Sequence, residues 1–188
     1  MSVSELTRYL LYISTILWLF PPIRQYKRSF FYFFLVLALL DPISFIYLEL
    51  TNKSMPFGFY ITANFLLFIS TLEKNSIQRN LFFIILSGLI LLGIIVFAGF
   101  TSKQSLIILL AFQFMILAGI LKKFIINFAS NKKINFFQLV LVFYILTIIT
   151  KFLNLLTSFA DATAFFIITS IAQIIFGFYF SIVRENNS

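Results

Sequence analysis

One apolar stretch, residues 29–50, constrains this chain more than any other feature. It consists almost wholly of aliphatic and aromatic side chains, and it is long enough to cross the roughly 30 Å hydrocarbon core of a bilayer as a helix. Near its middle lie Asp41, an acid that is costly in lipid, and Pro42, which has no backbone N–H. The stretch therefore predicts a membrane helix with an irregularity at its centre.

The composition extends this prediction to most of the chain. Of the 188 residues, 61% are hydrophobic and only 11% are charged, whereas soluble domains contain about 25% charged residues. The chain has no His and no Cys, which excludes disulfides, thiolate nucleophiles, ordinary zinc sites and Ser-His-Asp catalysis. The net charge of +8 is better explained by basic cytoplasmic loops than by nucleic-acid binding.

Seven apolar stretches predict an all-α, polytopic membrane bundle that forms one domain over residues 1–188. Asp161 is expected to cap the last helix, while Pro21 and Pro22 are expected to stop the first. The first stretch is interpreted as a helix rather than a signal peptide, because no small-residue cleavage site follows it. The predicted helices cover residues 6–20, 29–50, 57–72, 80–100, 105–128, 134–156 and 162–183.

The distribution of Lys and Arg predicts the orientation, since cytoplasmic loops are enriched in both. Ten of the 14 basic residues fall in the first, third and fifth loops and the tail, so we expect an outside N-terminus and a cytoplasmic C-terminus. The many Phe, Ile, Asn and Lys codons suggest an AT-rich bacterial genome, and hence the inner membrane. The predicted basic rim attracts anionic lipid or, alternatively, an acidic partner. It comprises Arg24, Lys27, Arg28, Lys122, Lys123, Lys132 and Lys133.

The chain contains a faint internal repeat. The second and sixth predicted helices both begin with a polar residue and two phenylalanines, at residues 29–31 and 135–137, and Ala63–Asn64 corresponds to Ala172–Gln173. This pattern suggests a 3+1+3 arrangement with the fourth helix as inverter, as in the parallel repeats of SWEET sugar transporters. Chance is the favoured explanation, because Phe and Leu are so frequent in this chain, and the repeat is the alternative.

Asp41 and Lys151 are predicted to lie at similar depth in the outer half of the bilayer. Asp41 follows Arg28 by 13 positions, or about 20 Å of helix, and Lys151 lies about 8 Å below the outer end of its helix. Opposite charges at one depth favour a direct ion pair. Alternatively, Lys151 extends outward towards Asp161 while Asp41 is protonated or bonded to backbone, or a ligand bridges the two.

Other polar side chains are expected around this pair. Thr147, Thr150 and Asn154 lie next to Lys151 in the sequence and complete the predicted outward-facing pocket. The buried amides are expected to form hydrogen bonds between helices or to contact a ligand, and Asn64 and Gln173 fall near mid-membrane where they can share one cluster. These amides are Asn64, Gln113, Gln138 and Gln173.

Pro42 predicts a distortion of its helix, because it removes the hydrogen bond to the carbonyl of Ala38. Ser44 or a neighbouring helix is the expected substitute donor.

In layout, the chain resembles small uncharacterised seven-helix membrane proteins of Bacteroidota. The resemblance rests on Phe-rich helices, a Lys-rich fifth loop and a short polar tail; it covers the whole chain loosely, carries no specific motif and implies no activity. A rhodopsin-like interpretation fails, since residues 162–183 contain no Lys for a retinal Schiff base.

These observations favour a non-catalytic membrane component, either an accessory subunit or a signal-input module of a separately encoded partner. The alternative is a transporter of small solutes or ions that uses the pocket around Asp41 and Lys151. An enzyme acting on lipid has only Asp41, Asp161 and Glu49 to offer. We expect no cofactor, no metal and no nucleic acid; the expected partners are the lipid bilayer and either another membrane subunit or a second copy of the chain.

Overall fold

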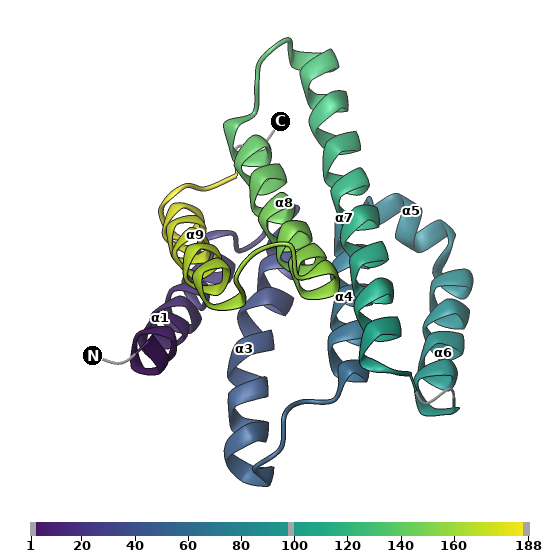
Figure 1. Cartoon of the computed structure of the whole chain (residues 1–188). Coiled ribbons are helices and arrows are strands. Elements are labelled where there is room, and N and C mark those ends of the chain that lie inside the picture. The colour runs from purple at the N-terminus through teal and green to yellow at the C-terminus, as the bar shows by residue number, and fades with distance from the viewer. Residues whose placement is uncertain (1–2, 98–99, 186–188) are drawn as a thin grey trace.

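A computed structural model describes residues 3–97 and 100–185. This part of the chain is 84% helix and contains no strand, which confirms the all-helical fold class. Its helices are α1 (Val3–Trp18), α2 (Phe20–Arg24), α3 (Phe31–Thr51), α4 (Phe57–Thr71), α5 (Lys74–Arg79), α6 (Leu81–Phe97), α7 (Ser102–Asn131), α8 (Phe136–Thr157) and α9 (Ala162–Ile182) (Figure 1).

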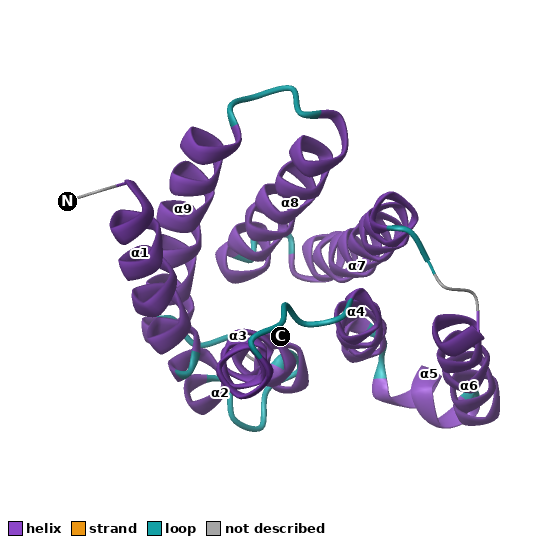
Figure 2. Ribbon diagram, turned by 60° about the horizontal axis from the view of Figure 1, so that its bottom comes forward, coloured by secondary structure: helices purple, strands orange, loops and turns teal. Residues whose placement is uncertain are grey.

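Six helices form a closed ring in the order α1, α3, α4, α7, α8 and α9, with α9 packed back on α1 (Figure 2). Helix α6 stands outside the ring against α4, and the short α2 packs on α3 and α9. Five segments are long and apolar enough to cross a membrane, namely Glu5–Arg24 and helices α3, α7, α8 and α9, while α4 and α6 are shorter apolar helices. The chain therefore has the helices of a multi-pass membrane protein.

The seven apolar helices α1, α3, α4, α6, α7, α8 and α9 begin and end within a few residues of the predicted ones. Three details of the prediction need correction. Pro21 and Pro22 do not end the helical path; they occupy the first turn of α2, where a missing N–H costs nothing. Helix α5 fills a predicted loop. Helix α7 begins at Ser102 because Thr101 and Gln104 form a capping box. Residues 98–99 of the fourth predicted helix and the polar tail after residue 185 lie outside the described residues.

Aromatic side chains fill the ring at the end that bears the C-terminus and the α7–α8 loop, which we call the C-terminal end (Figure 1). Phe180 of α9 lies 4.9 Å from Phe34 and 5.2 Å from Phe137, measured between ring centroids. Phe30 and Phe33 extend this cluster and are fully buried. Tilted and edge-to-face rings pack densely, so this half of the ring interior is closed.

A set of hydrogen bonds fastens the C-terminal segment to the α2–α3 connection. The fully buried Gln25 donates from Nε2 to the carbonyls of Phe180 (3.2 Å) and Val183 (2.7 Å), and its Oε1 accepts from the amide of Glu185 (2.9 Å). The Glu185 carboxylate accepts from the amides of Ser29 (3.0 Å) and Phe30 (3.4 Å) and from the Ser29 hydroxyl. We call these residues the C-terminal clasp; its carboxylate lies where the dipole of α3 favours an anion.

The close contact between α4 and α7 yields a first testable prediction, at Gly119. A Cβ on Gly119 would lie 2.7 Å from Oγ1 and 3.3 Å from Cβ of Thr71, so rotation of the Thr71 side chain alone does not relieve the contact. We expect Gly119→Ala to lower the free energy of unfolding by about 1–3 kcal/mol. The matched control is Gly93→Ala, because a Cβ there meets no atom within 4 Å.

Gly93→Ala is expected to be neutral or to raise stability by up to about 1 kcal/mol, since alanine reduces the entropy of the unfolded chain. Thermal unfolding of both variants in detergent measures the difference. Equal melting temperatures would show that α4 and α7 do not approach this closely.

Candidate functional site

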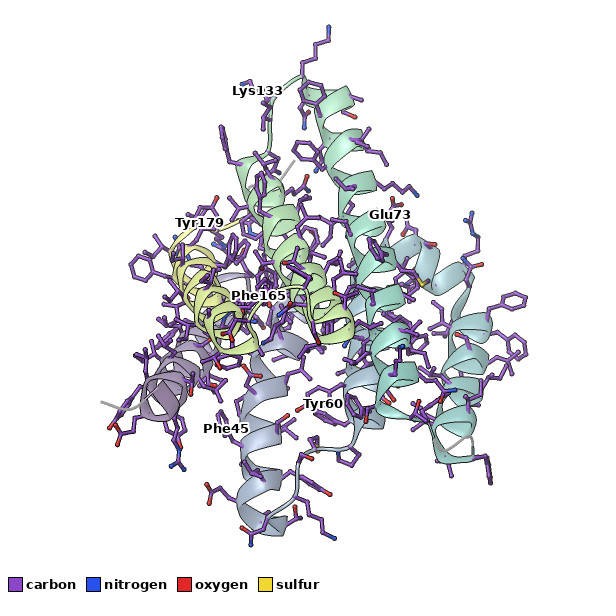
Figure 3. The ribbon with its side chains drawn as sticks, in the orientation of Figure 1. Phe45, Tyr60, Glu73, Lys133, Phe165 and Tyr179 are labelled. Carbon is purple, nitrogen blue, oxygen red and sulfur yellow. The ribbon has the colours of Figure 1, made fainter. Side chains whose placement is uncertain are left out.

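A cavity of about 400 Å³ occupies the ring interior on the other side of the aromatic core, and all six ring helices contribute to its wall. We call it the central cavity. Its volume lies within the range of small-molecule sites, roughly 300–1,000 Å³. Tyr60, which lies between α3 and α4 towards the end away from the C-terminus, belongs to this wall (Figure 3). The polar side chains that line it include Ser14, Asp41, Asn64, Gln113, Lys151 and Gln173.

Asp41 and Lys151 are the charged residues of this wall. The structure thus brings the two together, as their similar predicted depths suggested. The predicted direct ion pair is not formed, because the nitrogen and oxygen atoms of these two described side chains do not come within 4.0 Å. Helices α3 and α8 lie on opposite sides of the cavity and are not ring neighbours, which keeps the charges apart.

Lys151 also contacts an aromatic ring. Its Nζ lies 5.3 Å from the centroid of Phe166, in the range of a cation–π interaction. Asp161, the alternative partner, instead caps α9 by accepting a hydrogen bond from the amide of Ala164 (2.8 Å), which confirms its predicted capping role.

Two amides of the wall, Gln113 and Asn64, form a predicted hydrogen bond between helices. Gln113 Nε2 of α7 donates to Asn64 Oδ1 of α4, and Asn64 Nδ2 donates to the carbonyl of Tyr60 (2.8 Å). Gln113 Oε1 is buried and has no hydrogen-bond partner in the described chain. Gln173 lines the cavity, and its backbone carbonyl accepts from Trp18 Nε1 (3.1 Å). The wall therefore contains one buried hydrogen-bond acceptor, Gln113 Oε1, that can accept a hydrogen bond from a ligand.

Three predicted pocket residues do not line the central cavity, namely Thr147, Thr150 and Asn154. The face of α8 that lines it carries Tyr144, Ile148, Lys151 and Leu155, at the spacing of one helix side. Thr147 lies about 100° around the helix from Ile148, at the edge of this face, and with Thr150 it lines a separate hollow between α8 and α9. Asn154 is buried, but its Oδ1 accepts from the amide of Ala160 (2.9 Å) and orders the α8–α9 loop.

The surroundings of Pro42 differ from the prediction in one respect. Helix α3 continues through Pro42, and the hydroxyl of Ser44 donates to the carbonyl of Leu40 (2.9 Å) rather than to that of Ala38. A serine hydroxyl reaches the carbonyl four residues earlier, and for Ser44 that residue is Leu40. Ser44 Oγ in turn accepts from Tyr60 (3.1 Å), which joins α3 to α4 beside the cavity. The helix distortion itself stays a prediction.

A larger, mostly apolar hollow of about 790 Å³ adjoins the cavity. It lies between α1, α3, α8 and α9, with Arg8 and Glu49 among its few polar residues. Leu155 lines both spaces, and Phe166, the ring beneath Lys151, lines the hollow. Lys151 therefore lies at the boundary between the hollow and the central cavity.

The residues of the predicted basic rim have different environments. Arg28 and Lys123 line a second cavity, of about 730 Å³, at the C-terminal end together with Glu73 and Glu185. Arg24 donates to the carbonyl of Ile182 (2.9 Å). Lys122 lines a small hollow near Glu73, and Lys133 projects from the α7–α8 loop (Figure 3). Lys27 and Lys132 have left-handed backbone conformations at turns, with φ of 62° and 51°.

The sequence predicted neither the C-terminal clasp nor the burial of Arg28 Nε. The only signal was the presence of Gln25 and Glu185 close to helix ends, which is too common to indicate a contact. Arg28 Nε is buried without a partner among the described residues, although the sequence placed it on a solvated rim.

Comparison of the chain with protein-family models, with curated proteins and with solved structures gives no match.

Proposed function

We propose that this chain is a membrane carrier for small polar solutes and that the central cavity is its solute site. One observation supports this most strongly: a single cavity bordered by six helices contains one acidic and one basic side chain that do not pair with each other. Charged residues within membrane helices are costly and are usually retained for function. The aromatic core closes the ring on one side of the cavity, as expected for a carrier that is open to one face at a time.

The proposed topology has seven membrane crossings, an outside N-terminus and a cytoplasmic C-terminus in a bacterial inner membrane. The ring order supports the 3+1+3 arrangement, because α1, α3 and α4 form one half, α7, α8 and α9 form the other, and α6 stands apart. In this topology, the central cavity faces outward and the aromatic core faces the cytoplasm. A reporter fused after Ser188 should be active in the cytoplasm; activity only in the periplasm would reverse the assignment.

Uptake into proteoliposomes tests the carrier function even while the solute is unidentified. The purified chain is reconstituted, exposed to an isotope-labelled extract of bacterial small molecules, and washed. At least one labelled compound is expected to accumulate above the level in protein-free liposomes. The control is a proteoliposome with Asp161→Asn, because asparagine also caps a helix and residue 161 lies outside the central cavity. No enrichment of any compound would contradict the proposal.

A second candidate function is that of a membrane-complex subunit, and the position of α6 favours it. No side chain of the described α6 is buried, and the helix packs mainly on α4 and α5. Its apolar surface is thus open to lipid, to another subunit or to a second copy. Affinity purification in mild detergent distinguishes the cases: a stoichiometric partner favours the subunit, and a monomer or homo-oligomer favours the carrier.

A further inference from the structure

We propose that the central cavity binds a small zwitterion, with the cationic group of the ligand at Asp41 and its anionic group at Lys151. This inference rests on the proposed function, since it assigns a solute class to the same cavity.

The two charged side chains of the wall, Asp41 and Lys151, indicate the charge of the ligand. Asp41 and Lys151 share the cavity, and no nitrogen–oxygen pair between these described side chains lies within 4.0 Å. A ligand with a single charge would approach one of them favourably and would meet a like charge across the cavity. A ligand with one positive and one negative group compensates both, and each contact is strengthened where water is scarce.

The wall around Asp41 is suited to an ammonium group. The ring of Tyr144 lines the same cavity as Asp41, and Tyr144 packs against Trp18 with 4.7 Å between centroids. Both rings line the cavity, and aromatic faces attract cations. Gln113 Oε1, buried and unpartnered among the described residues, can accept one ammonium N–H.

The wall around Lys151 is suited to a carboxylate or another anion. Lys151 is the cation of this wall, and its ammonium has three donors. Leu155 and Phe166 lie between Lys151 and the apolar hollow. We infer that a ligand enters the central cavity from this hollow. The wall also carries apolar side chains such as Leu109 and Ile148, which suit a ligand with a short apolar body. The cavity volume of about 400 Å³ fits a molecule of amino-acid size.

Binding to the full-length chain in lipid nanodiscs tests this inference. The probes are glycine, 4-aminobutyrate and leucine, each with its methyl ester, which is a cation, and its N-acetyl derivative, which is an anion. Isothermal titration should detect at least one zwitterion, and its two singly charged derivatives should bind at least about tenfold more weakly. The zwitterion assignment is overturned if no zwitterion of the set binds, or if either derivative binds as tightly as its parent.

Variants of Asp41 and Lys151 test the assignment through a change in ligand preference, because a misfolded protein would lose all binding and would not change its preference. Asp41→Asn should shift the preference towards the N-acetyl derivative, and Lys151→Met should shift it towards the ester, because each removes one of the two charge contacts. Asp41→Glu and Lys151→Arg should keep the zwitterion preference. Unchanged preference in both neutral variants would overturn the assignment.

The two proposals fail in different ways. Uptake of a neutral or singly charged labelled compound in the proteoliposome experiment would retain the carrier function and remove the zwitterion. Zwitterion binding without uptake of any compound would retain the site and remove the carrier.

Discussion

Asp41→Asn is expected to weaken solute binding in the central cavity by about 30-fold or more. The change removes one partner of a charge contact in a site shielded from water, and such losses cost about 2–5 kcal/mol. The asparagine side chain has nearly the same size, so the cavity and helix α3 should be preserved. Lys151→Met is expected to have an effect of similar size for the same reason. Uptake and binding are measured with the compound identified in the proteoliposome experiment.

Two matched controls separate charge from position. Asp161→Asn changes the same chemical group at the cap of α9, and Lys53→Met removes a cation from the exposed α3–α4 connection. Both should bind the solute like the unmodified chain. If Asp41→Asn and Lys151→Met also bind normally, the two charges have no role in the solute site.

A double-mutant cycle in the absence of solute measures the attraction between the two charges. Each single change leaves the other charge without its counterpart, whereas the double change removes both. We expect a coupling energy of about 0.5–3 kcal/mol in thermal or denaturant unfolding, since coupled side chains in one site show values of this size. Additive effects would show that Asp41 and Lys151 do not sense each other across the cavity.

Gln25→Leu is expected to lower the free energy of unfolding by about 2–4 kcal/mol. Leucine has a similar volume but leaves the carbonyls of Phe180 and Val183 and the amide of Glu185 without their partners. An unpaired buried polar group costs about 1–3 kcal/mol, and Val183 is near enough to the surface for water to replace part of its loss. Unfolding in detergent monitored by circular dichroism gives the difference.

Gln78→Leu is the control for the clasp, because Gln78 is exposed on α5 and the same substitution there should change stability by less than about 0.5 kcal/mol. Glu185→Gln should lie between the two, since glutamine keeps an acceptor for Ser29 but loses the charge that the N-terminus of α3 favours. Equal stability of the Gln25 and Gln78 variants would mean that the clasp does not hold the C-terminal segment.

The candidate site could be predicted only in part. The depth of Asp41 and Lys151 follows from their distance to helix ends, because a helix rises by a constant 1.5 Å per residue. Depth does not determine which way a side chain points around the helix axis. Thr147 lies at the right depth but at the edge of the inward face of α8, where it lines a separate hollow, and Asn154 is held by the α8–α9 loop. Gln113 was identified as a buried amide, but its unpartnered oxygen depends on where Asn64 lies on the neighbouring helix α4.

The sequence by itself determined the helical class, the extents of the long helices and the cap at Asp161. These properties are local: an apolar run of sufficient length forms a helix in lipid, because every backbone group must be satisfied within the segment. The same run does not reveal its inward face. Helices such as α3 and α6 are apolar on all sides, so no amphipathic pattern tells which side meets a neighbour. Only the tertiary structure therefore decided the ring order, the exclusion of α6 and the bonds from Gln25 and Glu185 across most of the chain. These features arise because close packing selects one arrangement of surfaces that are chemically alike.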